Sequence, residues 1–293
     1  MTIDEQALMF ECEGETLVGV LSGASSAARR GVLIVVGGPQ YRVGSHRQFT
    51  LLARHLAGQG VPVMRFDYRG MGDSGGEPRT FEHASTDIRC AIDHFFASAP
   101  GLSEVVIWGL CDAASAALFY AHQDRRVSGL VLVNPWVRTE QGAARTYLRH
   151  YYVRRLLDPE LWRKIGRGEF GLRQSLGGMF ELIGGAIGRK PGAADRAGGS
   201  RVVAVPDVAE EPLPDRMEDG LRRFGGPVLL ILSGNDLTAQ EFKDVIAGSR
   251  GWQRLIKSRR ITRHDLPEAN HTFARREWRD QVARWTATWI KSY

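Results

Sequence analysis

The sequence predicts an α/β fold in which a mostly parallel, eight-stranded sheet is covered by helices on both faces and carries a helical cap insertion. The chain has 293 residues, of which 43% are hydrophobic, so it can bury a sizeable core. Short runs rich in β-branched apolar residues alternate with longer segments of helical periodicity, which is typical of a parallel sheet. This alternation stops between residues 136 and 225, where a different helical pattern indicates an insertion.

The predicted strands form an opening pair followed by six more. A short turn separates the opening pair, which we expect to be antiparallel. The predicted strands cover residues 7–12, 16–21, 32–36, 61–66, 105–108, 130–133, 228–232 and 261–266. The predicted helices cover residues 46–58, 83–98, 112–122, 239–248 and 274–291. We expect the first part of the core at 1–135, the insertion with a Gly- and Pro-rich connection at 136–225, and the second part of the core at 226–293.

Composition narrows the class of protein. No apolar stretch approaches the roughly 20 residues that a membrane-spanning helix needs. The N-terminus lacks the basic leader and apolar segment of a signal peptide, so we expect a cytoplasmic protein. Cys12, Cys90 and Cys111 are widely spaced with no histidine cluster beside them, which argues against a disulfide framework and a structural metal site. We expect no metal and no cofactor.

Positive charge is concentrated in the middle of the chain. The formal net charge is +6, and the segment from Arg138 to Arg173 alone holds nine Lys/Arg against four Asp/Glu. Three interpretations stay open: a solvated cap surface, binding of an acidic substrate through Arg149, Arg154 and Arg155, or peripheral contact with anionic lipid. No recognition motif for nucleic acid accompanies the charge, so we expect no nucleic-acid partner.

A cysteine lies at the junction of a predicted strand and a predicted helix. Gly109 and Ala113 flank Cys111 at the two positions where the backbones of strand and helix crowd each other. The spacing is typical of a nucleophile elbow, Gly-x-nucleophile-x-Gly, with Cys in place of Ser and Ala in place of the last Gly. The N-terminus of the helix would favour a thiolate. Taken alone, this stretch is also typical of a buried core cysteine.

Two further residues lie where a relay with Cys111 requires them. Asp236 follows the predicted strand 228–232, and His271 precedes the last predicted helix, which gives the order nucleophile, acid, base. His271 would take the thiol proton and later activate water, while Asp236 would fix the tautomer of His271. Taken singly, Asp236 is equally typical of a helix N-cap, and His271 of a surface or capping histidine.

Acyl transfer also needs two backbone N–H donors for an oxyanion. We expect one from Asp112, directly after Cys111. The other would come from the loop after the predicted strand 32–36. Since Pro39 has no N–H, Gln40 is the first choice in this loop and Gly38 the second. A plain tight turn is the alternative interpretation of the loop.

Two basic residues and one glycine-rich segment lie near this loop in the sequence. His46 and Arg47 begin a predicted helix and are candidates to bind a substrate carboxylate or phosphate, with a solvated helix start as the alternative. The segment D-x-R-G-x-G-x-S contains Asp67 and Arg69 but lacks the Lys-Ser/Thr of a P-loop and the spacing of a dinucleotide fingerprint. We expect it to form a structured turn beside the site.

These motifs together resemble those of the α/β-hydrolases. They are Gly37-Gly38-Pro39-Gln40, Phe66-Asp67-Tyr68-Arg69-Gly70-Met71-Gly72-Asp73-Ser74, Gly109-Leu110-Cys111-Asp112-Ala113, Gly234-Asn235-Asp236 and Asn270-His271. They occur in family order over residues 30–135 and 225–290. The GGPQYRVGSHRQF segment and the cysteine elbow resemble a narrower family, the exosortase A system-associated hydrolases (type one). Members of that family are found with genes for exopolysaccharide production and C-terminal protein sorting.

Two hypotheses about function follow. In the first, the protein is a hydrolase or acyltransferase in which Cys111 attacks an ester, thioester or lactone of a small acyl substrate that is acidic or lipid-like. In the second, it is a binding or assembly protein of an export pathway with a degenerate site. The cysteine in place of serine and the basic insertion favour the second hypothesis. Substrate identity is not encoded in the fold itself.

Overall fold

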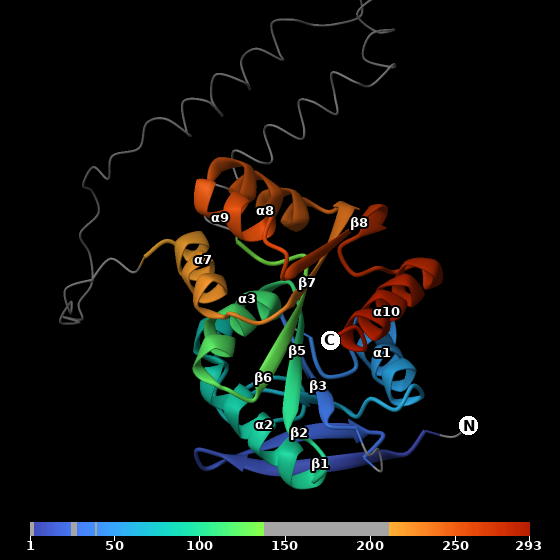
Figure 1. Ribbon diagram of the computed structural model, residues 1–293. Helices are drawn as coiled ribbons and strands as arrows, with labels where there is room; N and C mark the ends of the chain where they lie inside the picture. The colour runs from blue at the N-terminus through green and yellow to red at the C-terminus, as the bar shows by residue number, and fades with distance from the viewer. Residues whose placement is uncertain (1–2, 25–27, 39, 138–210) are drawn as a thin grey trace, which may run out of the picture. The chain divides into compact units, whose positions relative to one another are not determined.

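A β-sheet with helices on both faces forms the part of the chain that the structure describes. The computed structural model describes residues 3–24, 28–38, 40–137 and 211–293 (Figure 1). Contacts divide the chain into two units, Met1–Val137 with Leu213–Tyr293, and Arg138–Pro212. Arg149, Arg154 and Arg155 lie outside the described residues, as does most of the predicted insertion 136–225.

An eight-stranded sheet runs through the centre of this unit (Figure 1). The strands are β1 (Glu5–Cys12), β2 (Glu15–Ser22), β3 (Arg30–Val35), β4 (Val63–Asp67), β5 (Glu104–Leu110), β6 (Val127–Val133), β7 (Val228–Asn235) and β8 (Ile261–Asn270). Their order in the sheet is β1-β2-β4-β3-β5-β6-β7-β8. β2 pairs antiparallel with both β1 and β4, and the remaining pairs are parallel. The predicted fold class is confirmed for the sheet.

Helices cover both faces of the sheet. The α-helices are α1 (Gln48–Ala57), α2 (Ser85–Ser98), α3 (Asp112–Tyr120), α7 (Leu213–Arg223), α8 (Leu237–Gly248), α9 (Arg250–Ile256) and α10 (Arg276–Ile290). α1 and α10 lie together on one face, whereas α2, α3 and α7 lie on the other (Figure 1). Short 3-10 helices are η1 (Ser45–Arg47), η2 (Phe81–His83) and η3 (Ala121–Gln123). Among the described residues, no helix is both long enough and apolar enough to cross a bilayer.

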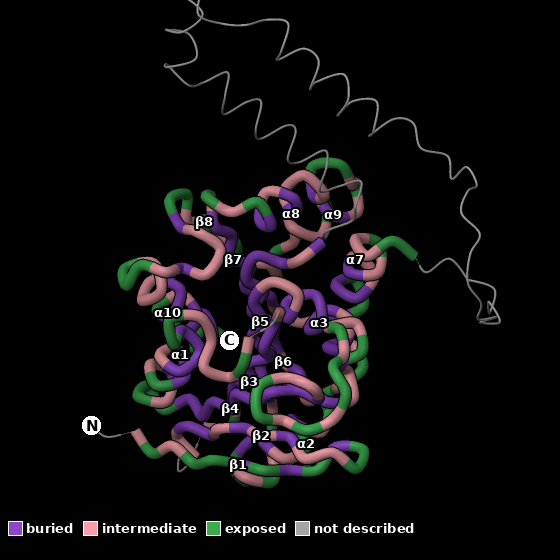
Figure 2. The backbone as a smooth tube through the Cα atoms, turned by 180° about the vertical axis from the view of Figure 1, so that it is seen from behind, coloured by how far each residue is buried: buried purple, intermediate pink, exposed green. Residues whose placement is uncertain are grey.

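Alternate side chains of the central strands pack into two separate apolar clusters, one on each face of the sheet. In β5, Val106 and Trp108 belong to the apolar cluster that includes α1 and α10. Val105 and Ile107 belong to the cluster on the opposite face. Successive side chains of a strand point to opposite faces, so a strand covered on both faces is apolar throughout. Figure 2 shows the result, a sheet whose central strands are buried.

Helix α7 lies within the sequence range that we predicted to be insertion and connection. The structure places it with the sheet core, because Met217 and Leu221 are buried in the cluster that contains α3. Gly220 lies against the carbonyl of Leu118, where a side chain has no room. Leu213, Met217 and Leu221 recur every four residues along α7 and all three pack on this core. They stand among charged residues and prolines, which favoured the prediction of a connection here.

The close approach of α7 to α3 yields a test of this packing. A methyl group at position 220 would collide with backbone atoms of Leu118, so we expect Gly220→Ala to destabilise the fold by roughly 1–3 kcal/mol. Thermal unfolding measures the change. Gly225→Ala is the matched control, because a methyl group there meets no atom within 4 Å. Equal melting temperatures for the two variants would contradict the proposed packing.

Candidate active site

Cys111 lies at the sharp turn between β5 and α3. Its backbone has φ 64° and ψ −126°, a conformation that residues with a side chain rarely adopt and that costs on the order of 1–3 kcal/mol. Two backbone hydrogen bonds hold the turn. The Cys111 N–H donates to the Val133 carbonyl at 2.9 Å, and the Trp136 N–H donates to the Cys111 carbonyl at 3.2 Å. The cysteine is thereby fixed at the carboxyl edge of the sheet.

Small residues around Cys111 are required by the close approach of β5 to α3. A Cβ at Gly109 would lie 2.6 Å from the carbonyl carbon and oxygen of Ala113, so no side chain fits there. A Cβ at Gly37, in the loop after β3, would lie 2.7 Å from the Leu110 carbonyl and closer still to Asp112. The glycines that marked this region in the sequence are therefore explained by backbone crowding.

His271 and Asp236 are hydrogen-bonded to each other. His271 Nδ1 lies 2.8 Å from Asp236 Oδ2. The same carboxylate is the N-cap of α8, since it accepts hydrogen bonds from the N–H groups of Thr238 at 3.1 Å and Ala239 at 3.3 Å. The Asp236 side chain is only 5% exposed. Asp236 thus serves as a helix cap and as the partner of His271 at the same time.

The surroundings of His271 favour its protonated form. Burial alone would lower its pKa, but hydrogen bonds with Asp236 and Cys111 and the negative charges of both raise the pKa of His271 to about 10. The imidazolium form of His271 is therefore favoured beside Asp236 and Cys111, and it is lost as the pH rises through about 10. The structure brings all three predicted residues of the relay together.

Asn134 has a positioning role that the sequence analysis missed. It follows β6, is fully buried and has φ 45°. Its Nδ2 donates to the His271 carbonyl at 3.2 Å, and its Oδ1 accepts from the Ser233 N–H at 2.8 Å. Asn134 thus ties the end of β6 to β7 and to the loop that carries His271. A polar residue directly after a buried strand is the sequence signal that could have indicated this role.

The loop after β3 differs from the predicted oxyanion arrangement. The Gln40 N–H donates to the Gly38 carbonyl at 2.8 Å, so in this conformation it does not point to an oxyanion. The Gly38 N–H lies next to Asp112 and donates to Asp112 Oδ2 at 2.8 Å. Gly38, the second choice from the sequence, is therefore the better candidate donor. The side chain of Gln40 instead accepts from the Ser45 N–H at 3.2 Å and so organises the loop.

The Asp112 carboxylate accepts hydrogen bonds from both candidate oxyanion donors, the N–H groups of Gly38 and of Asp112 itself. Besides the Gly38 N–H, its carboxylate accepts from its own backbone N–H and from the Ala113 N–H at 3.0 Å. Burial raises the pKa of Asp112, against these hydrogen bonds and the nearby charge of His271, which lower it. A carboxylate in this position competes with any oxyanion for the same N–H groups.

His46 and Arg47 lie before α1 rather than inside it. Both have left-handed backbones, with φ 52° and 59°, and both are exposed. Neither side chain forms a hydrogen bond or ion pair within the described part of the chain. The Arg47 N–H donates to the Gly44 carbonyl at 3.1 Å, which helps to hold this strained turn. The two side chains remain candidates for contact with substrate.

The segment with Asp67 and Arg69 forms a structured turn. The Asp67 carboxylate accepts from the backbone and side chain of Arg42 and from the Asp73 N–H at 3.2 Å. Arg69 pairs with the fully buried Asp87. The turn is therefore held by ion pairs and hydrogen bonds to Arg42 and to Asp87 of α2. Among the described residues, no three His, Cys, Asp or Glu side chains are grouped to hold a metal ion.

Comparison with known proteins identifies the family. A family model described as the alpha/beta hydrolase family matches residues 32–285. The chain belongs to the alpha/beta hydrolase family. This match includes the elbow, Asp236 and His271.

Several relatives and solved structures are similar to this chain at low sequence identity. The chain is 31% identical to polyketide transferase claH of Penicillium crustosum over 130 residues, 43% of this chain and 42% of that protein. It thus spans about two fifths of that relative's length. Esterase Pf2001 of Pyrococcus furiosus superposes with a TM-score of 0.64 at 14% identity, covering 99% of this chain and 92% of that one. Est1E of Butyrivibrio proteoclasticus, solved with ferulic acid bound, superposes with a TM-score of 0.62 at 14% identity. The superposition covers 97% of this chain and 98% of Est1E. These structural likenesses show the fold.

The position of Asp112 in this hydrolase fold yields a kinetic prediction. We expect Asp112→Ala to raise kcat/KM for a p-nitrophenyl ester about tenfold, because it frees two N–H donors and removes a negative charge beside the oxyanion. Asp112→Asn keeps an acceptor oxygen but loses the charge, so we expect an intermediate rate. Steady-state kinetics at constant pH measures the order. A lower rate in Asp112→Ala than in wild type would show that the carboxylate assists the reaction.

Proposed function

We propose that the protein is an acyl hydrolase or acyltransferase with a cysteine nucleophile, acting on an ester, thioester or lactone. One observation carries the proposal. The hydrogen-bonded pair of His271 and Asp236 contacts Cys111, which is held in the elbow conformation. A nucleophile, a base and a group that orients the base are the minimum for this chemistry.

In the first half of the proposed reaction, the Cys111 thiolate attacks the carbonyl carbon of the substrate. A bond forms between Sγ and carbon, and the carbonyl electron pair moves to oxygen. The backbone N–H groups of Gly38 and Asp112 would stabilise this oxyanion once the Asp112 carboxylate has moved away. The oxyanion then collapses, and the leaving group takes the proton of the His271 imidazolium. The product is a thioester on Cys111.

In the second half, neutral His271 takes a proton from water as the water oxygen attacks the thioester carbon. Collapse of the second oxyanion releases the acid and returns the Cys111 thiolate, paired with the imidazolium. Another nucleophile in place of water gives acyl transfer. Asp236 keeps Nδ1 of His271 hydrogen-bonded, so that Nε2 is the nitrogen that exchanges the proton.

Three features indicate the class of substrate. One relative is named a polyketide transferase, and Est1E was solved with ferulic acid bound, which supports a small acyl substrate for this protein. The exposed His46 and Arg47, with the basic residues Arg149, Arg154 and Arg155, support an acidic substrate. The sequence resemblance to exosortase A system-associated hydrolases adds a link with exopolysaccharide production or protein sorting.

A second candidate function is a binding or assembly protein that uses the hydrolase fold without turnover. The specific observation in its favour is the Asp112 carboxylate, which occupies the Gly38 N–H that an oxyanion would need. In that case partner binding would not depend on Cys111 or His271.

Selective alkylation tests the nucleophile. Cys12 is 1% exposed, and burial raises its pKa, so we expect it to react slowly. Cys111 is partly exposed and contacts an imidazolium, so iodoacetamide should modify it first at pH 7. Peptide mapping identifies the adduct, and His271→Gln should slow modification of Cys111 at least tenfold. Earlier modification of Cys12 or Cys90 would remove the basis for the nucleophile assignment.

Turnover of short acyl esters and thioesters tests the activity. We expect Cys111→Ala and His271→Ala each to reduce kcat on the order of 10³-fold or more, because each is part of one relay. Cys90→Ala, on α2 at the opposite face, is the matched control and should keep full activity. Activity should also fall as the pH rises through about 10, since the imidazolium that protonates the leaving group is lost. Activity unchanged in Cys111→Ala would favour the binding protein.

A further inference from the structure

Two cysteines from distant parts of the sequence come together on one face of the sheet. Cys12 is the last residue of β1, and Cys90 lies on α2, which packs beside β1 (Figure 1). Both side chains belong to the same apolar cluster. Cys12 is 1% exposed, whereas Cys90 is partly exposed, and both are free thiols. Cys111 packs against the cluster on the other face of the sheet, so Cys12 and Cys90 form a pair of their own.

Two contacts fix the position of α2 along β1. The ring of Phe10 stacks on the ring of His94 with centroids 4.9 Å apart. The Cys12 thiol donates to Asp87 Oδ1 at 3.6 Å. Side chains two residues apart on a strand share a face and lie about 7 Å apart, close to the rise of about 6 Å for four residues of a helix. Cys90 lies three residues after Asp87 and four before His94, so it lies between the two contacts on the helix face that meets β1.

The two thiols are close enough to interact. Burial raises the pKa of the Cys12 thiol, and a hydrogen bond with the Cys90 thiol raises it further. A disulfide requires sulfur atoms about 2 Å apart and Cα atoms about 4–7 Å apart. Hydrogen-bonded thiols need only side-chain rotations to reach that geometry. The pair is therefore placed for a covalent bond between β1 and α2.

The neighbouring groups favour oxidation of the pair over metal binding. Asp87 is fully buried and pairs with Arg69, whose backbone N–H also donates to it at 2.9 Å. Its carboxylate is thus engaged by a cation and is unsuited to hold a metal ion beside the thiols. In the part of the chain that the structure describes, no three His, Cys, Asp or Glu side chains are grouped to do so. The reaction open to two adjacent thiols without a metal is thiol–disulfide exchange.

We propose that Cys12 and Cys90 are a modification site at which a low-molecular-weight disulfide, such as glutathione disulfide, oxidises the pair to an intramolecular disulfide. Cys90, the more exposed partner, attacks one sulfur of the reagent as a thiolate, which forms a mixed disulfide and releases one thiol. Cys12 then loses its proton and attacks Cys90 Sγ, which forms the protein disulfide and releases the second thiol. The two protein thiols are oxidised, and the reagent is reduced to two thiols that take up the two protons. This site does not depend on the proposed function.

The disulfide would tie one edge of the sheet to a helix. β1 is the strand at that edge and pairs with β2. A bond from Cys12 to Cys90 closes a long loop that contains β2, β3, α1 and β4. Closure of a long loop lowers the entropy of the unfolded chain. We therefore expect oxidation to raise the melting temperature by roughly 5–10 °C.

The test uses the full-length protein, reduced with dithiothreitol and desalted. It is equilibrated at constant pH with mixtures of reduced and oxidised glutathione, quenched with acid, unfolded, alkylated and mapped by mass spectrometry without reduction. We expect one disulfide that joins the Cys12 and Cys90 peptides, together with the rise in melting temperature. Cys90→Ser should show neither. Cys111→Ala is the matched control, because it removes the third thiol from the other face of the sheet, and it should form the same disulfide.

Three results would overturn the proposal. They are alkylation of both Cys12 and Cys90 at every glutathione ratio, a mixed disulfide at Cys90 that Cys12 does not displace, and a Cys90 bridge between two copies of the chain. An equal rise in melting temperature in Cys90→Ser would also count against it, because the rise would then come from another site. Cys12→Ser changes a fully buried side chain, so Cys90→Ser decides if Cys12→Ser fails to fold. No readout uses turnover, so a protein without esterase activity tests the pair equally well.

Discussion

The strained backbone of Cys111 is the constraint on which the rest of the site depends. Its φ of 64° turns the chain from β5 directly into α3, so that the thiol is presented at the edge of the sheet instead of entering the core. The turn closes only because Gly109 has no side chain to meet Ala113. Hydrogen bonds to Val133 and Trp136 offset part of the strain. Every other group of the site is useful only because this turn holds the sulfur in reach of His271.

Two carboxylates near Cys111 are stabilised in different ways and have opposite effects. Asp236 bonds to His271 and to the first N–H groups of α8, so its negative charge supports an imidazolium. Asp112 bonds to the N–H groups at the start of α3 and to Gly38, where its charge opposes an oxyanion. Burial raises the pKa of Asp112, so the charged form is disfavoured there. Both carboxylates lie at helix N-termini at the carboxyl edge of the sheet. Asp236 supports the proposed chemistry there, whereas Asp112 opposes it.

The sequence predicted the features that depend on strand order and missed those that depend on side-chain direction. Cys111, Asp236 and His271 each follow a strand, and carboxyl ends of parallel strands meet at one edge, so their proximity was predictable. The prediction that the Gln40 N–H is an oxyanion donor was wrong, because the direction of this N–H depends on the φ and ψ of a loop, which no sequence pattern specifies. Helices α7 and α9 were missed because one is mostly charged and the other has seven residues. Cys12 could not be linked to Cys90, since the two meet only after α2 packs beside β1.

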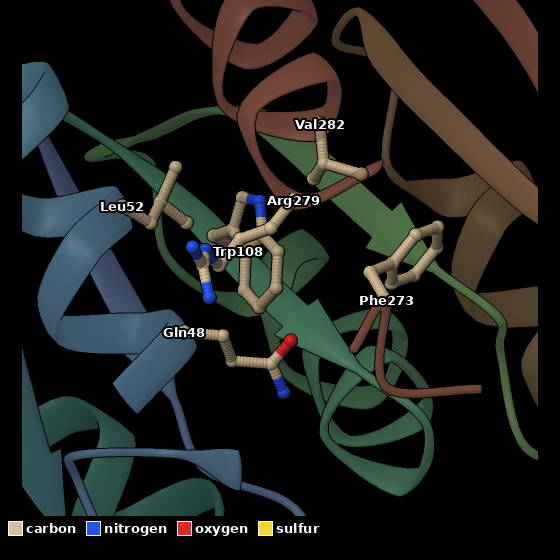
Figure 3. A pocket seen from close by; sticks show the side chains of 6 residues that line it. All are labelled: Gln48, Leu52, Trp108, Phe273, Arg279 and Val282. Carbon is tan, nitrogen blue, oxygen red and sulfur yellow. The ribbon is translucent and has the colours of Figure 1, made fainter. Parts of the chain in front are cut away.

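One loop connects the candidate oxyanion region with a small pocket lined by Gln48 and Trp108 (Figure 3). It begins at Gly38, whose N–H meets Asp112, and it ends at Gln48, whose amide lines the pocket. Left-handed backbones at His46 and Arg47 lie directly before Gln48 and set the direction in which α1 starts. Gln48 is itself buried, as the first residue of α1. The strained turn therefore leads directly from two exposed basic side chains, His46 and Arg47, into a buried amide.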